Sequence, residues 1–192
     1  GSGKTTTAMH IMVYLLLKNE SVGVIDLDIR QKSLFRFLEN RETYSNQMGV
    51  ELSLPKRGFI IESANDSKNL AYQEEEEMLD TCIQELKSKC AYILIDCPGA
   101  NTNFAILAHK RADLIISPIN DSLIDFDLLG RINTRSKKIT NASIYSEMIW
   151  NTRKHRIVLN LPSSKWFVLR NRMAHVNSKN KKQLETSLIE LS

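Results

Sequence analysis

The chain has 192 residues, 42% of them hydrophobic and 25% charged, which is enough to bury one α/β core. No apolar run approaches the roughly 18 residues of a membrane-spanning helix. The three cysteines and four histidines are scattered without CxxC or metal-ligand spacing, which argues against a disulfide framework and against a zinc or iron–sulfur site. We therefore expect a cytoplasmic protein with no membrane segment in this stretch.

Charge is unevenly distributed along the chain. Residues 1–100 carry 11 Lys and Arg against 15 Asp and Glu, whereas residues 101–192 carry 15 against 7. A basic second half suits contact with a polyanion, but a solvated basic surface explains the same composition.

Strand and helix patterns alternate along the chain. Four runs rich in Val, Ile and Leu are typical of buried parallel strands, and helical periodicity lies between them. In chain order we predict a helix at 4–18, a strand at 22–28, helices at 33–39 and 73–88, a strand at 91–99, a helix at 102–110, strands at 112–118 and 166–171, and a helix at 179–191. This order predicts an α/β fold: a doubly wound, mostly parallel sheet with helices on both faces, in a single domain over residues 1–192.

Four glutamates at 74–77 suit the N-terminus of the helix predicted at 73–88, and are otherwise a solvated face. Two other segments are less regular. Residues 41–65 are polar and have little periodicity, with a predicted turn at 55–58. Residues 131–156 are basic and contain YSEMIWNTRKHR, which predicts a helix with Tyr145, Met148 and Ile149 facing inward.

The stretch GSGKTTT at residues 1–7 has the pattern of a phosphate-binding loop. In such loops, glycines let successive backbone N–H groups point at phosphate oxygens, and the following helix adds its N-terminal dipole. A lysine reaches the β- and γ-phosphates and the next hydroxyl binds magnesium. Five residues are in register for these roles: Gly1, Gly3, Lys4, Thr5 and Thr6. The other interpretation is a helix-start turn without a ligand.

Aspartates end the two predicted strands that follow this loop. Asp26 and Asp28 close VIDLD, and Asp96 precedes a Pro-Gly turn in ILIDCPG. A carboxylate at the carboxyl end of a central parallel strand is where a nucleotide-bound Mg²⁺ is held, directly or through water. Together with the glycine-lysine-threonine turn, these aspartates predict binding of a nucleotide with magnesium.

Four stretches together resemble the ParA/MinD group of deviant Walker ATPases. They are GSGKTTT, VIDLDIRQKSLFRFLENR, YILIDCPGANT and ADLIISPINDSLIDFDLLG. DLDIRQ with FRFLENR, INDSLIDFDLLG and WFVLRNRMAHVNSKNKKQLE are most similar to the MipZ branch, the division-plane positioning ATPases. The resemblance covers most of the chain and is weakest at 41–73 and 132–164.

The resemblance implies roles for the loop residues and the magnesium site. Lys4 would pair with the β- and γ-phosphates of ATP, Thr5 would coordinate Mg²⁺, and Thr6 would bond near the α-phosphate. Asp96 would bind Mg²⁺ through water, and Gly99 would move to sense the γ-phosphate. Slow phosphoryl transfer of this kind depends mainly on positioning and charge neutralisation.

Three further roles follow from the same resemblance. Asp28 would position the attacking water, and Asp26 would buttress the loop lysine and the magnesium ion. Asn171 resembles the family's purine-recognising asparagine, although an asparagine at a strand end also serves as a loop cap.

The resemblance also implies partners. ATP-driven homodimers of this group bind DNA without sequence preference, through phosphate neutralisation. The candidate DNA-binding residues are Arg170, Arg172, Lys179, Lys181 and Lys182, each of which could instead be solvated surface. A ParB-like centromere-binding protein and a nucleoid-associated location are further expectations.

The family's loop reads K-G-G-x-G-K-[ST], so Gly1 corresponds to its second glycine. The resemblance therefore implies an internal fragment. The signature lysine, which reaches the partner's phosphates across the dimer, would precede Gly1, and further strands would follow Ser192.

The predicted function is a nucleotide switch that hydrolyses ATP slowly, cycles between monomer and DNA-bound dimer, positions the division plane and coordinates it with chromosome segregation. The nearest alternative is a ParA-type chromosome or plasmid partitioning ATPase, and a MinD-type membrane switch is a related one. Remoter alternatives are a metabolic P-loop ligase, for which no second substrate pocket is evident, an iron–sulfur carrier, whose paired cysteines are missing, and an inactive fragment.

Overall fold

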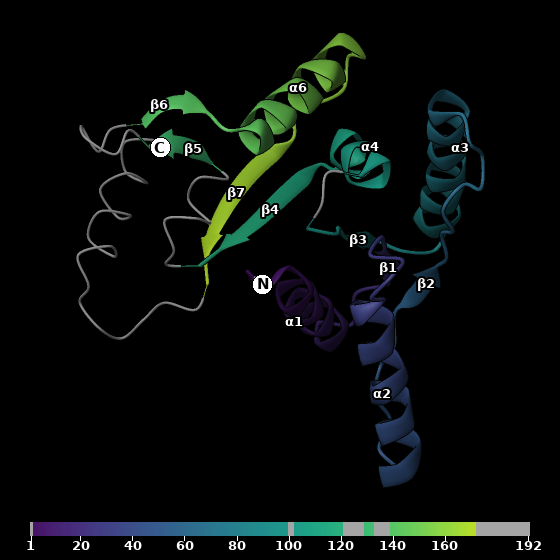
Figure 1. The fold of residues 1–192 in the computed structure, drawn as a ribbon. Helices are drawn as coiled ribbons and strands as arrows, with labels where there is room; N and C mark the ends of the chain where they lie inside the picture. Colours follow the sequence, from purple (N-terminus) through teal and green to yellow (C-terminus); the bar gives the residue numbers. More distant parts are fainter. Residues whose placement is uncertain (1, 100–101, 121–128, 133–138, 172–192) are drawn as a thin grey trace, which may run out of the picture. The chain divides into compact units, whose positions relative to one another are not determined.

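A computed structural model describes residues 2–99, 102–120, 129–132 and 139–171, without the side chains at 131, 132, 139 and 140. The backbone contacts divide the chain into two compact units (Figure 1). One unit is Lys4–Ala108, and the other combines Gly1–Gly3 with His109–Ser192. Parallel strands and helices alternate, so the predicted α/β fold class is confirmed. The expectation of a single domain stays a prediction.

The unit Lys4–Ala108 contains a three-stranded parallel sheet in the order β2-β1-β3. Its elements are α1 (Lys4–Leu17), β1 (Val22–Asp26), α2 (Ser33–Met48), β2 (Lys56–Gly58), α3 (Lys68–Lys87), β3 (Tyr92–Asp96) and most of α4 (Asn103–Arg111). β1 is central and buried along its whole length, as its run of apolar residues predicts. The register places Asp26 beside Asp96 at the carboxyl end of the sheet.

Helices cover both faces of this sheet because successive strand residues point to opposite sides. Val22, Val24 and Leu94 pack in one cluster with Met12 and Leu16 of α1 and with apolar residues of α2. Ile25, Ile93 and Ile95 pack in a second cluster with apolar residues of α3 and α4. The doubly wound arrangement predicted from the strand and helix patterns is therefore present in this unit.

The second unit contains two small sheets and one long helix. β4 (Leu114–Ile119) pairs in parallel with β7 (Lys165–Arg170), and β5 (Gly130–Ile132) pairs antiparallel with β6 (Ile139–Ala142). α6 (Ile144–Val158) follows β6, and the Ser143 hydroxyl caps it by accepting a hydrogen bond from the Ser146 N–H. Ile149 of this helix is buried and Tyr145 and Met148 are half-buried, in agreement with the predicted inward face.

Polar side chains connect the elements of the second unit. The Tyr145 hydroxyl lies 2.7 Å from Ser117 Oγ and 3.3 Å from His109 Nε2, and the Trp166 indole N–H donates to Ser117 Oγ. The buried Arg156 guanidinium donates to three main-chain carbonyls and to the Asp113 carboxylate. These bonds fasten α6 to the end of α4 and to the β4–β7 sheet, with their donors satisfied in the interior.

The first polar segment is more ordered than its composition predicts. α2 ends at Met48 instead of residue 39, because its polar second half is an exposed helix that Gly49 terminates in the left-handed region, with φ 64°. Residues 56–58 form β2 and not the predicted turn. Gly58 permits this pairing, since a Cβ at that position would lie 2.4 Å from Cys82 Sγ of α3.

Two other sequence predictions are corrected. α3 begins at Lys68, so the four glutamates at 74–77 lie beyond its first turn, which contains no acidic residue. β7 is exposed or half-buried along its length, not buried on both faces, because among the described residues it pairs only with β4. The helix predicted at 179–191 lies outside the described residues. Within the described part of the chain, none of the helices combines the length and apolarity needed to cross a bilayer.

Candidate nucleotide site

The glycine-lysine-threonine stretch forms the turn into α1. Gly3 has φ 91°, a left-handed conformation that favours glycine, and the helix begins at the next residue, Lys4. The first turn of α1 contains Lys4, three threonines and no acidic residue. The first N–H groups of a helix have no intrahelical partner, so this end of α1 combines unpaired donors, a positive dipole end and a lysine. Such an arrangement favours an anion.

Asp26, at the end of β1, holds the following loop and the start of α2. One carboxylate oxygen accepts from the Asp28 N–H at 3.1 Å. The other accepts from the Leu34 N–H at 3.0 Å and the Phe35 N–H at 3.3 Å. Burial raises the pKa of Asp26, and these three backbone bonds oppose the increase. Asp26 thus caps α2 from a distance, where the residue in the cap position, Lys32, provides no side-chain bond.

Asp96, at the end of β3, lies beside Asp26 and contacts the loop at the start of α1. The Thr5 hydroxyl donates to its carboxylate, whose side chain is only 3% exposed. Burial raises the pKa of Asp96 to about 6, and the Thr5 hydrogen bond and the Lys4 charge oppose that increase. The second carboxylate oxygen, Oδ2, is buried and has no hydrogen-bond partner among the residues that the structure describes. Buried polar atoms normally have a partner, so this oxygen is available to a ligand.

Lys4 and Gly99 lie close to this carboxylate. A Cβ placed on Gly99 would lie 3.5 Å from Lys4 Nζ, so the turn after β3 passes directly beside the lysine. Asp28 lies further along the β1–α2 loop, where its Oδ1 accepts from the Gln31 N–H at 3.1 Å. The neighbouring Cys97 has its thiol pKa raised to about 12 by burial, so it is neutral at physiological pH.

Asn171 is found in the other unit, next to the start of the loop. Its side-chain Nδ2 donates to the Ser2 carbonyl at 3.0 Å, and its backbone N–H donates to the Ile119 carbonyl at 2.7 Å. A Cβ on Gly3 would lie 2.2 Å from the same Nδ2 atom. Glycine at position 3 is therefore required both by the backbone angle and by the space that the Asn171 amide occupies.

The structure brings several predicted residues together and leaves others outside the described residues. Within Lys4–Ala108, the end of α1 and the carboxyl ends of β1 and β3 gather Lys4, Thr5, Asp26, Asp96 and Gly99. Thr6 lies in the same helical turn, exposed, and Asp28 lies in the adjacent loop. Arg170 ends β7 and is half-buried. The remaining predicted residues lie outside the described part: Gly1, Arg172, Lys179, Lys181 and Lys182.

The residues present fit a magnesium–nucleotide complex. Mg²⁺ prefers oxygen ligands and commonly keeps several waters while taking one or two protein oxygens and the phosphates. The Thr5 hydroxyl and the unpartnered oxygen of Asp96 are such ligands, and Lys4 adds a cation for the phosphates. Among the described residues, Asp26 could contribute little to a metal, since both its oxygens already accept backbone N–H groups.

The parallel sheet, the helices on both faces and the glycine-lysine-threonine turn place the protein in the P-loop class of α/β folds. Within that class, the chain belongs to the MipZ family, because the family model described as ATPase MipZ matches residues 1–192.

The chain is also similar to curated proteins and to solved structures. The septum site-determining protein MinD of Synechocystis is 28% identical over 144 residues, which are 66% of this chain and 53% of that protein. The cobyrinic acid a,c-diamide synthase of Mycobacterium smegmatis was solved with an ATP analogue and magnesium. Its structure matches this one with a TM-score of 0.61 at 17% sequence identity, and the match covers 100% of this chain and 78% of the synthase chain. A plasmid partition protein from Borrelia burgdorferi has a TM-score of 0.58 at 20% identity, covering 100% and 81%. The chain spans about half the length of the curated relatives it matches.

Two interactions of the site were not anticipated from the sequence. The sequence gives only a weak signal that Asp26 caps α2. The residue before the helix start at Ser33 is a lysine, which does not cap, so another residue is needed for that role. The bond from Asn171 to Ser2 joins residues 169 positions apart and has no sequence signal.

Proposed function

We propose that the protein binds ATP with Mg²⁺ at the start of α1 and hydrolyses it slowly to ADP and phosphate. The observation that supports this most directly is the buried Asp96, with one oxygen held by Thr5 and the other without a partner. A buried carboxylate that lacks a protein partner is costly, and a bound cation would remove the cost. The M. smegmatis synthase, which has the same fold, was solved with an ATP analogue and magnesium.

Each residue has a part in this proposal. Lys4 neutralises the β- and γ-phosphates, the backbone of Gly1 and Gly3 leaves room for them, and Thr6 bonds near the α-phosphate. Thr5 and Asp96 would hold a Mg²⁺ ion, which would supply positive charge to the phosphates during transfer.

The remaining roles concern hydrolysis and the base. Asp28 orients the attacking water and accepts its proton, and Asp26 keeps the β1–α2 loop in place for that task. Gly99 moves with the γ-phosphate, next to Lys4. Asn171 recognises adenine with its amide, which would exchange the bond to the Ser2 carbonyl for one to the base.

At the level of the cell, we propose a nucleotide switch in division-plane positioning, coordinated with chromosome segregation. The support is the match of the MipZ family over residues 1–192. ATP would favour a homodimer that binds DNA through Arg170 and the basic residues at 172, 179, 181 and 182. A ParB-like protein would determine where on the nucleoid the protein cycles between monomer and dimer. Nonspecific DNA binding of this kind depends on phosphate neutralisation.

The nucleotide proposal is tested by titrating ATP with and without Mg²⁺ into the protein and into Lys4→Ala. The matched control is Lys18→Ala, which removes an exposed lysine just after the other end of the same helix. We expect Lys4→Ala to lose measurable affinity, because the phosphates lose their fixed cation, and Lys18→Ala to bind normally. Equal affinities of the two variants would show that the loop does not bind phosphates.

The DNA proposal is tested with a salt series on random duplexes. Each DNA phosphate that the protein no longer neutralises should reduce the slope of log affinity against log salt by about 0.9. We expect Lys181→Ala with Lys182→Ala to flatten this slope equally for all sequences, and more with ATP than with ADP. An unaltered slope would assign both lysines to ordinary surface. Transport of a plasmid, without an effect on septum position, would instead indicate a partitioning ATPase.

A further inference from the structure

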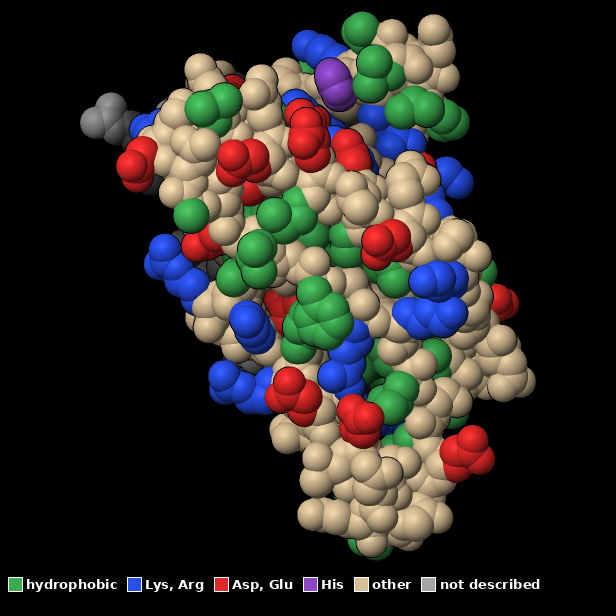
Figure 2. All heavy atoms as spheres, turned by 90° about the vertical axis from the view of Figure 1, so that its right-hand side faces the viewer, with side chains coloured by type: hydrophobic (Ala, Val, Ile, Leu, Met, Phe, Trp, Pro, Cys, Tyr) green, Lys and Arg blue, Asp and Glu red, His purple; other side chains and the backbone are tan. Residues whose placement is uncertain are grey.

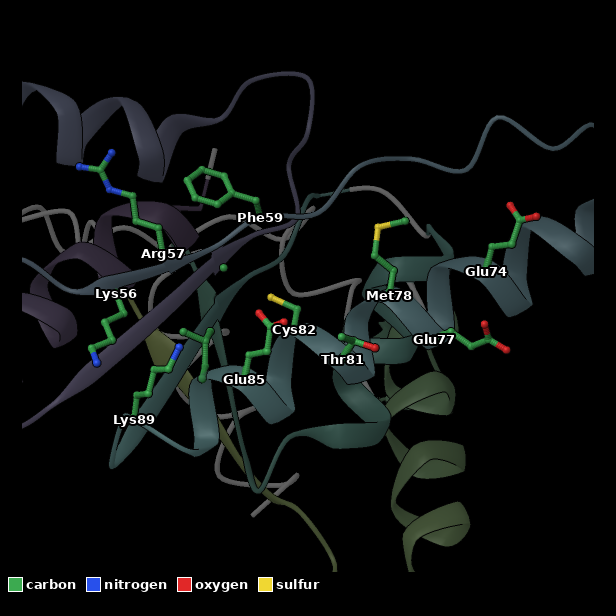
Figure 3. A pocket seen from close by; sticks show the side chains of 12 residues that line it. Lys56, Arg57, Phe59, Glu74, Glu77, Met78, Thr81, Cys82, Glu85 and Lys89 are labelled. Atoms are coloured by element: carbon green, nitrogen blue, oxygen red, sulfur yellow. The ribbon is translucent and has the colours of Figure 1, made fainter.

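An open groove lies between β2 and α3, within the unit Lys4–Ala108 and away from the residues of the candidate nucleotide site. Its volume is about 820 Å³. Figure 3 shows its lining, which comes from β2 and the residue after it, from α3 between residues 74 and 86, and from Lys89 beyond the end of α3. Figure 2 shows basic, acidic and hydrophobic side chains interspersed on one face of the molecule. The lining of the groove also contains both signs, with three basic and three acidic residues (Lys56, Arg57, Lys89, Glu74, Glu77 and Glu85), so it lacks the single-sign charge that a polyanion needs.

The strand beside the groove has one unused edge in the described part of the chain. β2 is the outer strand of the order β2-β1-β3 and pairs only with β1. The other edge of such a strand offers main-chain N–H and C=O groups to a further strand. α3 packs closely against β2 at Gly58, where a Cβ would lie 2.4 Å from Cys82 Sγ. The groove therefore combines a free strand edge with a helix that can cover one face of an added strand.

The groove has two lysines near one end, two glutamates near the other and smaller side chains between them. Lys56 and Lys89 lie at one end, with the Glu85 carboxylate beside them, and Glu74 and Glu77 lie at the other end (Figure 3). Met78, Thr81 and Cys82 are between the two ends.

The anionic end is held in place. The Ser63 hydroxyl and the Asn65 amide donate to the Glu74 carboxylate, and these hydrogen bonds lower its pKa. The carboxylate is therefore ionised at neutral pH and fixed in one position. An occupant of the groove would meet a preorganised negative group at this end.

Exposed apolar side chains continue from the strand. Phe59 follows β2 directly, Ile61 lies two residues further, and they are 70% and 69% exposed. The Phe59 ring packs against Phe35 with centroids 5.3 Å apart. Single exposed apolar residues are common on protein surfaces, but two beside an open strand edge favour a docking surface.

We propose that this groove binds an extended peptide of a partner protein as a fourth strand beside β2, with an acidic residue at the Lys56 and Lys89 end and a basic residue at the Glu74 and Glu77 end. Strand addition of this kind takes its affinity from main-chain bonds and its specificity from alternate side chains. The inward side chains of the peptide would be small, to fit over Met78, Thr81 and Cys82.

A peptide fits the groove better than a second copy of the chain does. Two copies related by a two-fold axis would also pair opposite charges, since their β2 strands would be antiparallel. However, two concave surfaces placed against each other leave both grooves unfilled, whereas a single strand occupies the space next to α3. A measurement of self-association distinguishes these occupants.

The test uses two capped peptides of about eight residues. In one, two Glu precede alternating Thr and Val and two Lys follow, and in the other only the Glu and Lys pairs are exchanged. Binding to the full chain is measured by fluorescence anisotropy, without nucleotide. We expect one peptide to bind the wild type, and Thr81→Arg to abolish this binding by filling the middle of the groove. Thr81 is exposed, so the variant should fold.

Exchanging the charges at the two ends of the groove tests the direction in which the peptide binds. In the double variant Lys89→Glu with Glu77→Lys, we expect the preference between two peptides that differ only in which end is acidic to reverse by about fivefold to tenfold. The matched control is Lys87→Glu with Glu39→Lys, which makes the same two changes at exposed positions outside the groove lining. It should keep the wild-type preference.

Three results would overturn the proposal. One is that neither peptide binds. The second is that Thr81→Arg binds as well as the wild type. The third is that the chain self-associates without peptide and Thr81→Arg makes it monomeric, in which case a second copy occupies the groove.

Discussion

Asp26 and Asp96 have nearly the same place in the fold but different surroundings. They are register partners at the carboxyl ends of β1 and β3, and their side chains are 4% and 3% exposed. Alternation along each strand places both aspartates on the sheet face that packs against α1 and α2. In both, burial is the main cause of a raised pKa.

Their hydrogen bonds separate them. The oxygens of Asp26 accept three backbone N–H groups, so the fold itself satisfies this carboxylate. Asp96 accepts from the Thr5 hydroxyl, and its Oδ2 has no partner within the described part of the chain. Two buried acids in equivalent positions thus differ in their hydrogen bonds: backbone N–H groups satisfy both oxygens of Asp26, whereas one oxygen of Asp96 has no partner among the described residues.

The largest effect on stability is expected at Asp26. Asp26→Ala leaves the Asp28, Leu34 and Phe35 N–H groups without their acceptor, and we expect the free energy of unfolding to fall by about 2–3 kcal/mol. Asp26→Asn retains one carbonyl oxygen and should lose about half as much. Urea denaturation followed by circular dichroism measures both. If Asp26→Ala is as stable as the wild type, the capping of α2 does not depend on this carboxylate.

At Asp96 we expect a substitution to increase the stability of the protein. An increase in pKa from 3.8 to about 6 disfavours the ionised form in the folded state, so Asp96→Asn should stabilise the ligand-free protein at pH 7 by on the order of 1–3 kcal/mol. The same variant should lose the Mg²⁺-dependent part of its nucleotide affinity, since a neutral amide is a poorer magnesium ligand. Denaturation without ligand and ATP titrations with and without Mg²⁺ measure the two effects. A destabilised variant would show that Asp96 is needed for the fold.

The raised pKa of Asp96 also predicts how the stability gained in Asp96→Asn depends on pH. The folded protein retains the Asp96 proton up to about pH 6, and the unfolded chain only to 3.8. The free energy of unfolding of the wild type therefore falls, through this group, as the pH rises across that interval. The stability difference between Asp96→Asn and the wild type should be small near pH 4 and complete above about pH 6. Denaturation series at four pH values test this, and a difference independent of pH would contradict the assignment.

The two aspartates also show what the sequence could predict. Strands such as 22–28 are evident because buried parallel strands are continuous apolar runs, and the aspartates mark where they end. The different roles of Asp26 and Asp96 depend on backbone groups eight and nine positions away and on a threonine 91 positions away, distances that no local pattern encodes.

Other elements were missed for equally physical reasons. The second half of α2 is a polar helix with little apolar periodicity, and only Gly49 indicates where it ends. β2 is Lys-Arg-Gly, which no strand propensity favours, and it forms because Gly58 permits close packing against Cys82. Its groove therefore had no sequence signal at all.

The smallest effect on stability is expected at Asp28, two residues beyond the end of β1. Its Oδ1 accepts a single hydrogen bond from the exposed Gln31 N–H, and we expect Asp28→Ala to change the free energy of unfolding by only about 0.5 kcal/mol. Asp28→Ala should nevertheless retain ATP and stop its hydrolysis, because the attacking water loses the carboxylate that orients it. Phosphate release and nucleotide affinity, measured on the same preparation as the denaturation curve, separate these effects. Normal hydrolysis in Asp28→Ala, together with loss of hydrolysis in a folded Asp26→Asn, would exchange the two roles and make Asp26 both cap and catalyst.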